Sequence, residues 1–233
     1  LIGGAGGLTG SLLGACILVA LIVLGVLMTF LVSRLLSATI LKGVPSSFTL
    51  EMPPYRRPQI LKVIVRSIVD RTLKVLGRAV ISAAPAGLLI WVLANVPLSG
   101  QTTLLTALTG FLDPFARRLG MDGCILTGFL LGLPANEIVV PIIIMTYMAR
   151  GSLLEVEGVQ LMQLFTANGW TWITAVSTLL FSLMHWPCAT TLLTIRKESG
   201  SLKWTLLSFL VPTVCGIILC FLFTTAALFL FPA

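Results

Sequence analysis

GCILTGFLLGLPANEIVVPIIIMTYMA, residues Gly123 to Ala149, is the stretch of sequence that decides the fold. It consists of two apolar segments separated by Gly132, Pro134, Asn136 and the single acidic residue Glu137. Two short half-helices fit this pattern better than one long helix, because glycine and proline interrupt helices. Non-helical backbone is tolerated at membrane depth only where protein or water covers it. The stretch therefore predicts a re-entrant hairpin or a broken helix in a membrane protein.

The composition of the whole chain supports a membrane protein. Of the 233 residues, 57% are hydrophobic and 10% are charged, and the mean hydropathy is +1.06. A soluble domain of this length carries about 25% charged residues. These values argue against a soluble domain, a disordered chain and a nucleic-acid-binding domain, so we expect no nucleic-acid partner. The five cysteines contain no C-x-x-C pair, so a disulfide framework is not predicted.

Four long stretches contain no Asp, Glu, Lys or Arg, and each could hold a spanning helix: Leu1–Ser33, Ala79–Leu112, Gly158–Ile195 and Trp204–Ala233. The third stretch would form a helix far longer than the ~30 Å hydrocarbon core, so it must be broken. Pro187 marks the expected break, because proline lacks the N–H that continues a helix. The chain is therefore predicted to be an all-α polytopic membrane protein with broken or re-entrant helices.

The charged residues lie between these stretches and predict the orientation of the chain. Residues 34–78 form a connector with an excess of Lys and Arg, which the positive-inside rule places in the cytoplasm. Charged residues recur there at steps of four and predict an interfacial amphipathic helix over Gln59–Arg78: Lys62, Arg66, Asp70, Lys74 and Arg78. The turn Arg196–Lys203 is also positive and should face the same side. Both positive segments can face the cytoplasm if one of the broken elements is re-entrant and does not cross the membrane. We expect this element to be Gly123–Ala149.

These boundaries divide the sequence into four parts. We expect residues 1–33 to be the first transmembrane helix, 34–78 the connector, 79–203 a membrane domain with helix breaks at 132–137 and 185–190, and 204–233 the last transmembrane helix. No positively charged region precedes the first apolar run, so no signal peptide is visible. We therefore expect further sequence upstream of Leu1.

Polar groups gather at the two predicted helix breaks. Ionisable residues in the bilayer are costly and often mark an ion pathway, and Glu137 is the most informative of them. The alternative is that Asn136 caps the second half-helix and that Glu137 complements the helix dipole. His185 and Cys188 are three residues apart beside Pro187, which frees backbone carbonyls. A lone histidine is also often a structural residue, so both roles stay open for His185.

A carboxylate, a thiol, an imidazole and free carbonyls together suit a borderline divalent transition metal. Three metal-ligating residues are therefore predicted: Glu137, Cys188 and His185. The transport pathway is predicted to include their neighbours in the breaks: Pro134, Asn136, Pro187 and Thr190. No catalytic residue is predicted, because the chain holds no phosphate loop and no triad order. Discontinuous helices in two repeated halves are typical of secondary transporters, and only one such set occurs here, so a complete transporter needs another half.

Three ordered segments resemble the ferrous iron transport protein B (FeoB) family: SSFTLEMPPYRRP at Ser46–Pro58, GLPANEIVVP at Gly132–Pro141, and HWPCATTLLTIRKESGSLKWT at His185–Thr205. The resemblance implies a Gate-type helical bundle that works with an upstream Gate repeat and an N-terminal GTP-binding domain. It also implies a bacterial or archaeal cytoplasmic (inner) membrane, with Glu137 and Cys188 as pathway groups. Many members of the family have a lysine where this chain has Asn136.

The resemblance favours a permease segment for ferrous iron uptake, with Fe(II) as the transported substrate and no enzyme activity in this chain. No cofactor should be bound tightly, and GTP should act only through the upstream domain. The expected partners are the lipid bilayer, the upstream Gate repeat and the GTP-binding domain, and a homo-oligomer is an open alternative. Two further alternatives are a Gate-fold transporter of nucleosides or other organic solutes and a non-transporting membrane assembly protein. The breaks offer few polar groups for a ribose and a base but do offer a thiol, which favours metal.

Overall fold

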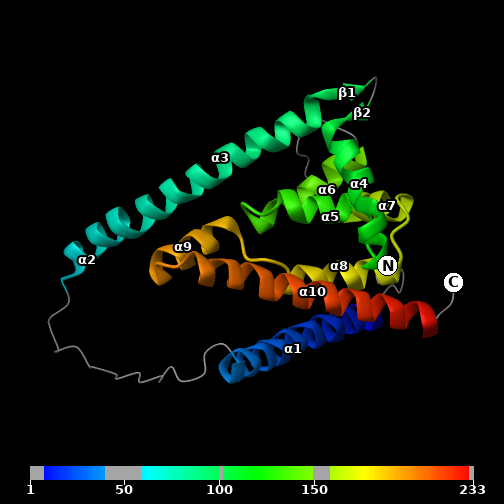
Figure 1. Ribbon diagram of the computed structural model, residues 1–233, viewed down its shortest axis with the longest axis horizontal. Coiled ribbons are helices and arrows are strands. Elements are labelled where there is room, and N and C mark those ends of the chain that lie inside the picture. The colour runs from blue at the N-terminus through cyan, green and yellow to red at the C-terminus, as the bar shows by residue number, and fades with distance from the viewer. Residues whose placement is uncertain (1–7, 40–58, 100–101, 149–157, 231–233) are drawn as a thin grey trace. The chain divides into compact units, whose positions relative to one another are not determined.

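The computed structural model describes residues 8–39, 59–99, 102–148 and 158–230 of the chain (Figure 1). These residues form, in order, α1 (Leu8–Thr39), α2 (Ile60–Arg66), η1 (Ser67–Leu73), α3 (Lys74–Asn95), β1 (Pro97–Ser99), β2 (Thr102–Thr103), α4 (Leu104–Arg118), α5 (Gly123–Leu131), η2 (Asn136–Ile138), α6 (Val139–Met148), α7 (Gly158–Ala167), α8 (Trp172–Met184), α9 (Ala189–Ser199) and α10 (Leu202–Leu230). The element η1 is a π-helix, and η2 is a 3₁₀-helix. The chain divides into two compact units, residues 2–77 and residues 78–233.

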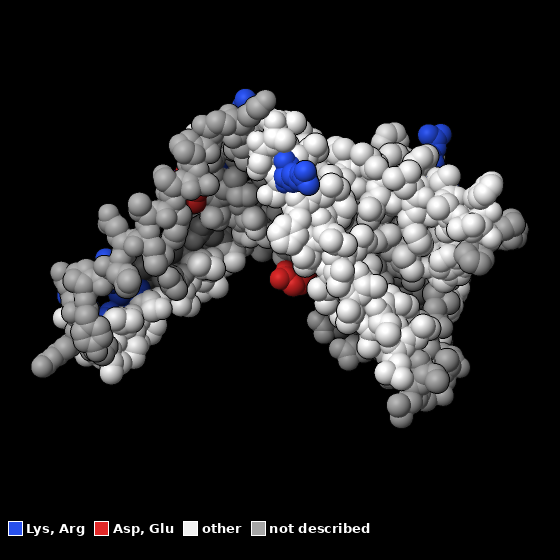
Figure 2. Space-filling view, turned by 90° about the horizontal axis from the view of Figure 1, so that it is seen from below, with Lys and Arg blue, Asp and Glu red and all other residues white. Residues whose placement is uncertain are grey.

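Among the described residues, four helical segments are long and apolar enough to cross a membrane: Leu12–Thr39, Val75–Asn95, Trp172–Ser199 and Leu202–Leu230. A further apolar segment, Asn136–Met148, is too short to cross alone. Figure 2 shows a face of the molecule on which charged side chains are few. The prediction of an all-α polytopic membrane protein is therefore confirmed.

The unit of residues 2–77 begins with one long helix. This helix, α1, continues to Thr39 and so includes Arg34, where the sequence predicted the start of the connector. Arginine can keep its charged group in water while its aliphatic part stays in apolar surroundings, so it is tolerated near a helix end. Residues 40–58 of the predicted connector, which include the Ser46–Pro58 segment, lie outside the described residues.

The predicted amphipathic helix over Gln59–Arg78 is not a separate element. Instead, α2 and η1 follow one another directly and lead into α3. The four-residue spacing that predicted the amphipathic face does not hold through η1, because a π-helix forms i→i+5 hydrogen bonds. The helical segment therefore continues from the polar region into the second candidate span.

In the unit of residues 78–233, α5 and α6 form an antiparallel hairpin. Gly128 of α5 faces Ile143 of α6, and Gly132, just after α5, faces Val139 at the start of α6. A Cβ atom at Gly128 would lie 2.5 Å from Ile143 Cγ1, so glycine allows the two helices to approach closely. With 9 and 10 residues, α5 and α6 are about 14 and 15 Å long, and neither can cross the ~30 Å core. The apolar stretch therefore folds as two half-helices that lie side by side.

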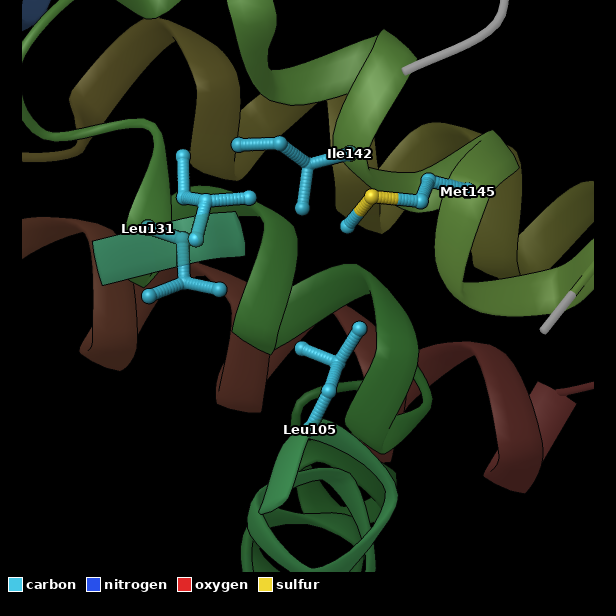
Figure 3. Close-up of a cluster of buried hydrophobic side chains, with 5 residues drawn as sticks. Leu105, Leu131, Ile142 and Met145 are labelled. Carbon is cyan, nitrogen blue, oxygen red and sulfur yellow. The ribbon is translucent and has the colours of Figure 1, made fainter. Parts of the chain in front are cut away.

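A cluster of buried side chains holds this hairpin against α3 and α4. Figure 3 shows Leu105 of α4, Leu131 of α5, and Ile142 and Met145 of α6 pointing toward one another. Ile90 of α3 completes the cluster. Lipid chains are as apolar as these side chains, so inside a bilayer the cluster stabilises the fold through close packing.

Polar residues start several of the helices. Thr103 and Thr106 form a reciprocal capping box at the start of α4, with N···O distances of 2.9 and 3.3 Å. The Thr171 hydroxyl accepts a hydrogen bond from the Thr174 N–H at the start of α8, at 3.3 Å. Before α4, β1 pairs antiparallel with β2, with Pro97 opposite Thr103. This short ladder is not predicted by the sequence. It lies between α3 and α4, where Pro97 prevents α3 from continuing.

Helices α8 and α10 pack closely over small residues. A Cβ atom at Gly216 of α10 would lie 3.2 Å from the Met184 Cβ of α8. The buried hydroxyls of Ser177 and Thr224 are 3.3 Å apart and join the same two helices. Gly120, whose φ is 76°, lies against both hydroxyls from the turn between α4 and α5. Small residues and hydroxyl pairs of this kind are typical of interfaces between membrane helices.

The apolar stretch Gly158–Ile195 is broken twice. One break contains Pro187, since α8 ends at Met184 and α9 begins at Ala189. The other separates α7 from α8, where Gly169 has a φ of 81°. This second break is not predicted by the sequence, although a glycine can adopt the left-handed conformation at little cost.

Candidate functional site

The two helix breaks meet in the structure. The N–H of Ala189, the first residue of α9, donates a hydrogen bond to the carbonyl oxygen of Leu133 at 2.8 Å. Leu133 directly precedes Pro134, and Ala189 directly follows Cys188. The two residues that form this bond are therefore direct neighbours in the chain of residues predicted for the site.

Glu137 lies in η2, the turn that starts the second arm of the hairpin, and its side chain is exposed. The N-cap residue of η2 is Ala135, and no side chain caps this turn. The alternative in which Asn136 caps the second half-helix is therefore wrong. Glu137 does lie in the first helical turn, where a negative charge interacts favourably with the helix dipole. The exposed Glu137 side chain therefore lies at the start of the second arm of the hairpin.

Cys188 is the N-cap residue of α9. Its Sγ atom lies 3.1 Å from the Thr190 Oγ1 and 3.1 Å from the Thr191 Oγ1. Pro187, Cys188 and Thr190 are all half-buried. The thiol and the two hydroxyls form a compact polar group directly beside the joint between the breaks. A polarisable sulfur with oxygen neighbours suits a borderline divalent cation.

His185 is packed among aromatic rings. Its Nδ1 atom lies 2.8 Å from the carbonyl oxygen of Ser182, and because a carbonyl only accepts, we assign the proton to Nδ1 and a lone pair to Nε2. The ring centroids of Phe129, Phe181 and Trp186 lie 5.1, 6.1 and 6.0 Å from that of the imidazole. The Nε2 atom is buried and has no hydrogen-bond partner in the described part of the chain. The nitrogen that could bind a metal is therefore covered by protein in this conformation.

The three predicted ligands are not gathered into one site. Within residues 8–39, 59–99, 102–148 and 158–230, no group of three His, Cys, Asp or Glu side chains could hold a metal ion. The structure brings the two breaks together and groups Cys188 with Thr190, but Glu137, Cys188 and His185 do not form a closed ligand set.

A polar network at the other end of the hairpin is not predicted by the sequence. Tyr147 of α6 donates a hydrogen bond to Asp122 Oδ2 and accepts one from Trp170 Nε1 at 2.7 Å. Asp122 also caps α5, because its Oδ1 accepts from the Ile125 N–H at 2.7 Å. An aspartate directly before an apolar run is a helix-start signal, so this cap could be predicted from Asp122 and Gly123. The bond from Trp170 to Tyr147 joins distant parts of the sequence, so no local sequence pattern predicts it.

Known protein families match the chain in two adjacent regions. The family model described as "Ferrous iron transport protein B C terminus" matches residues 18–71. The Gate family model, described as "Nucleoside recognition", matches residues 76–202, which is more than half of the chain. The second match includes both helix breaks and the hairpin.

Curated proteins from distant organisms are similar to the chain over most of its length. The Fe(2+) transporter FeoB of Staphylococcus aureus (strain MSSA476) is 30% identical over 217 residues, which cover 89% of this chain and 31% of that protein. The Fe(2+) transporter FeoB of Synechocystis sp. (strain ATCC 27184 / PCC 6803 / Kazusa) is 28% identical over 213 residues, 90% of this chain and 33% of that protein. The Fe(2+) transporter FeoB of Methanocaldococcus jannaschii is 27% identical over 215 residues, 87% of this chain and 30% of that protein.

The chain spans about a third of the length of these curated relatives. No solved structure matches it. The two family regions follow one another along the chain and together contain the helix breaks, the hairpin and most of the candidate spans. The chain therefore belongs to the FeoB family and corresponds to its C-terminal membrane region, which contains a Gate domain.

Proposed function

We propose that this chain is the C-terminal membrane part of an Fe(II) transporter. The hydrogen bond from Ala189 to Leu133 carries the proposal, because it joins two interrupted helices inside one membrane domain. Interrupted helices leave backbone carbonyls that can replace part of the hydration shell of an ion. The three relatives are named as Fe(2+) transporters, which supports Fe(II) as the substrate.

The residues around the joint suit a metal ion better than an organic solute. Three side chains are proposed to contact Fe(II): Glu137, Cys188 and His185, the last after a change of conformation that uncovers its Nε2 atom. Four neighbours are proposed to line the pathway: Pro134, Asn136, Pro187 and Thr190. A small number of protein ligands suits an ion that must leave the site as readily as it enters. A nucleoside would need more hydrogen-bonding groups for its ribose and base.

The remaining parts of the transport machinery are proposed to lie outside this chain. GTP binding and hydrolysis belong to an upstream domain, and an upstream Gate repeat completes the pathway. Assembly of several copies is a second way to supply the missing half. The similarity to proteins about three times as long supports this division of labour. The location is a bacterial or archaeal cytoplasmic (inner) membrane, the lipid bilayer is a partner, and no tightly bound cofactor is required.

Uptake of radiolabelled Fe(II) tests the proposed function. Membrane vesicles that contain the complete protein, kept under reducing conditions, are expected to take up Fe(II) in a saturable manner when GTP is supplied. Excess adenosine or uridine should not compete. Uptake of labelled nucleoside without Fe(II) uptake would support the organic-solute alternative instead. Vesicles that transport neither solute would support an assembly role.

The charged segments are proposed to face the cytoplasm, with residues 34–78 as the connector and Arg196–Lys203 on the same side. In a variant without native cysteines, Gln59→Cys and Ser199→Cys should react with a membrane-impermeant maleimide only after permeabilisation. Leu98→Cys, at an exposed position in β1 just after the C-terminal end of α3, should react in intact spheroplasts. Labelling of positions 59 and 199 from outside would reverse the proposed orientation.

A further inference from the structure

Two carboxylates anchor the start of α5. Asp113 of α4 accepts a hydrogen bond from the Gly123 N–H at 3.0 Å through Oδ1, and its Oδ2 accepts from the Arg117 Nε–H at 2.6 Å. Asp122 accepts from the Ile125 N–H at 2.7 Å. The first N–H groups of a helix have no partner within the helix, so these bonds satisfy two of them. They also fix the base of the hairpin on α4.

Tyr147 connects this anchor to the start of α8. Its hydroxyl donates to the second oxygen of Asp122 and accepts from the Trp170 Nε1–H at 2.7 Å. Trp170 lies two residues before α8 and stacks on Phe165, with ring centroids 4.1 Å apart and an interplanar angle of 6°. The Tyr147 ring also contacts Phe165 edge to face, at 6.3 Å. One hydroxyl therefore joins the turn before α5, the end of α6 and the turn before α8.

The hairpin is consequently attached at its two ends to residues on either side of α8, Trp170 before it and Ala189 after it. At its base, the Tyr147 hydroxyl is bonded to the turn that precedes α8. At its tip, the Leu133 carbonyl accepts from the Ala189 N–H, which follows α8. Between these points, the rings of Phe129 and Phe181 meet edge to face at 4.9 Å. A displacement of the base along α8 would therefore be transmitted to the tip.

We propose that Tyr147 is a positioning residue of the transport pathway, which holds the hairpin in register with α8 so that the Leu133 carbonyl at the tip stays bonded to Ala189, the residue after Cys188. This inference rests on the proposed function. The close packing of Gly128 on Ile143 makes α5 and α6 move together, so a change at the base alters the joint between the breaks. Tyr147 itself does not contact the ion.

The variant Tyr147→Phe in the complete protein tests this role. It removes the hydroxyl, keeps the ring that contacts Phe165, and deprives Asp122 and Trp170 of one hydrogen-bond partner each. The KM for Fe(II) uptake is expected to rise about fivefold, while the maximal rate stays within about twofold. A simple loss of folded protein would instead lower the maximal rate at constant KM.

A crosslinking measurement reports the register without any transport. Leu133→Cys and Ala189→Cys are combined with Cys188→Ser, which removes the adjacent native thiol. The backbone hydrogen bond between positions 133 and 189 should bring their Cα atoms into the range of about 4.4–6.8 Å that a disulfide needs. Mild oxidation should crosslink this pair, and the added Tyr147→Phe change should slow crosslinking about three- to tenfold.

Thr146→Val is the matched control, because the buried Thr146 hydroxyl bonds only to Ile142 O of its own helix in the described structure, at 2.7 Å. It should leave both KM and crosslinking unchanged. Trp170→Phe keeps an aromatic ring on Phe165 and removes the bond to Tyr147, so it should shift both measurements in the same direction as Tyr147→Phe. If Tyr147→Phe does not fold, Trp170→Phe decides the question.

Unchanged crosslinking in Tyr147→Phe and Trp170→Phe would overturn the positioning role, whatever the KM shows. A wild-type protein that does not take up Fe(II) would instead refute the proposed function. In that case, slower crosslinking in the two variants would still support the role of Tyr147 in holding the hairpin on α8.

Discussion

Replacement of Gly123 by alanine is expected to lower the stability of the membrane domain by about 3 kcal/mol or more, because α5 can then no longer pack on α4. A Cβ atom at Gly123 would overlap the carbonyl oxygen of Thr109 and would lie 3.1 Å from the Cα atom of Asp113. Both atoms belong to the backbone of α4, so no side-chain rotation relieves the overlap. The variant should unfold at a lower temperature in detergent and give less monodisperse protein.

Gly110→Ala is the control for this prediction. Gly110 lies in α4, and apart from its chain neighbours and the backbone of its own helix, no atom of the described residues lies within 4 Å of a Cβ placed there. Alanine favours a helix over glycine by about 1 kcal/mol, so this variant should be as stable as the original protein or slightly more stable. Equal unfolding temperatures for Gly123→Ala and Gly110→Ala would contradict the described packing of α5 on α4.

Glu137→Gln and Cys188→Ser are each expected to reduce Fe(II) uptake by the complete protein about tenfold at unchanged expression. Gln keeps the size of Glu137 and removes its charge, and Ser keeps a polar group at position 188 and removes the soft ligand. A desolvated divalent ion needs anionic or polarisable ligands, so either loss should slow its passage. Initial rates of radiolabelled Fe(II) uptake, normalised to protein amount, measure the effect.

Cys215→Ser is the control, because Cys215 lies in α10 and outside both breaks. It should transport at the original rate. If Glu137 and Cys188 contact the same ion, the double variant should lose less than the product of the two single effects. Normal Fe(II) transport by both single variants would contradict a pathway shared by Glu137 and Cys188. The interaction of Glu137 with the helix dipole would then be the explanation for the charge at this position.

The positions of the main helix breaks could be predicted because they depend on local chemistry. Pro134 and Pro187 lack an N–H wherever they stand, and Gly132 packs against Val139 in the space that a Cβ would need. The break at Gly169 contains no proline and was therefore harder to see, although its φ of 81° shows why glycine stands there. Local signals of this kind predicted the hairpin and the interruption after α8.

The contacts that assemble the site could not be predicted in the same way. The network of Tyr147, Asp122 and Trp170 joins three separate turns, and each residue type alone is compatible with many environments. The alternative in which Asn136 is the cap is wrong because the helical turn begins one residue earlier, after Ala135, whose backbone is extended (φ −151°, ψ 117°). The start of a helix depends on the path of the preceding backbone, which a single sequence does not specify.

The bond that joins the two breaks uses only main-chain atoms, from Ala189 N–H to Leu133 C=O. Replacement of the Leu133 side chain by that of alanine removes neither atom of this bond, so alanine scanning would pass over it. Proline at position 189 is the exception, because it removes the N–H. Position 189 is the first residue of α9, where proline is well accepted, and Cys188 already has the extended backbone that precedes a proline (φ −61°, ψ 158°). A single proline would thus separate the two breaks while the helix that follows remains intact.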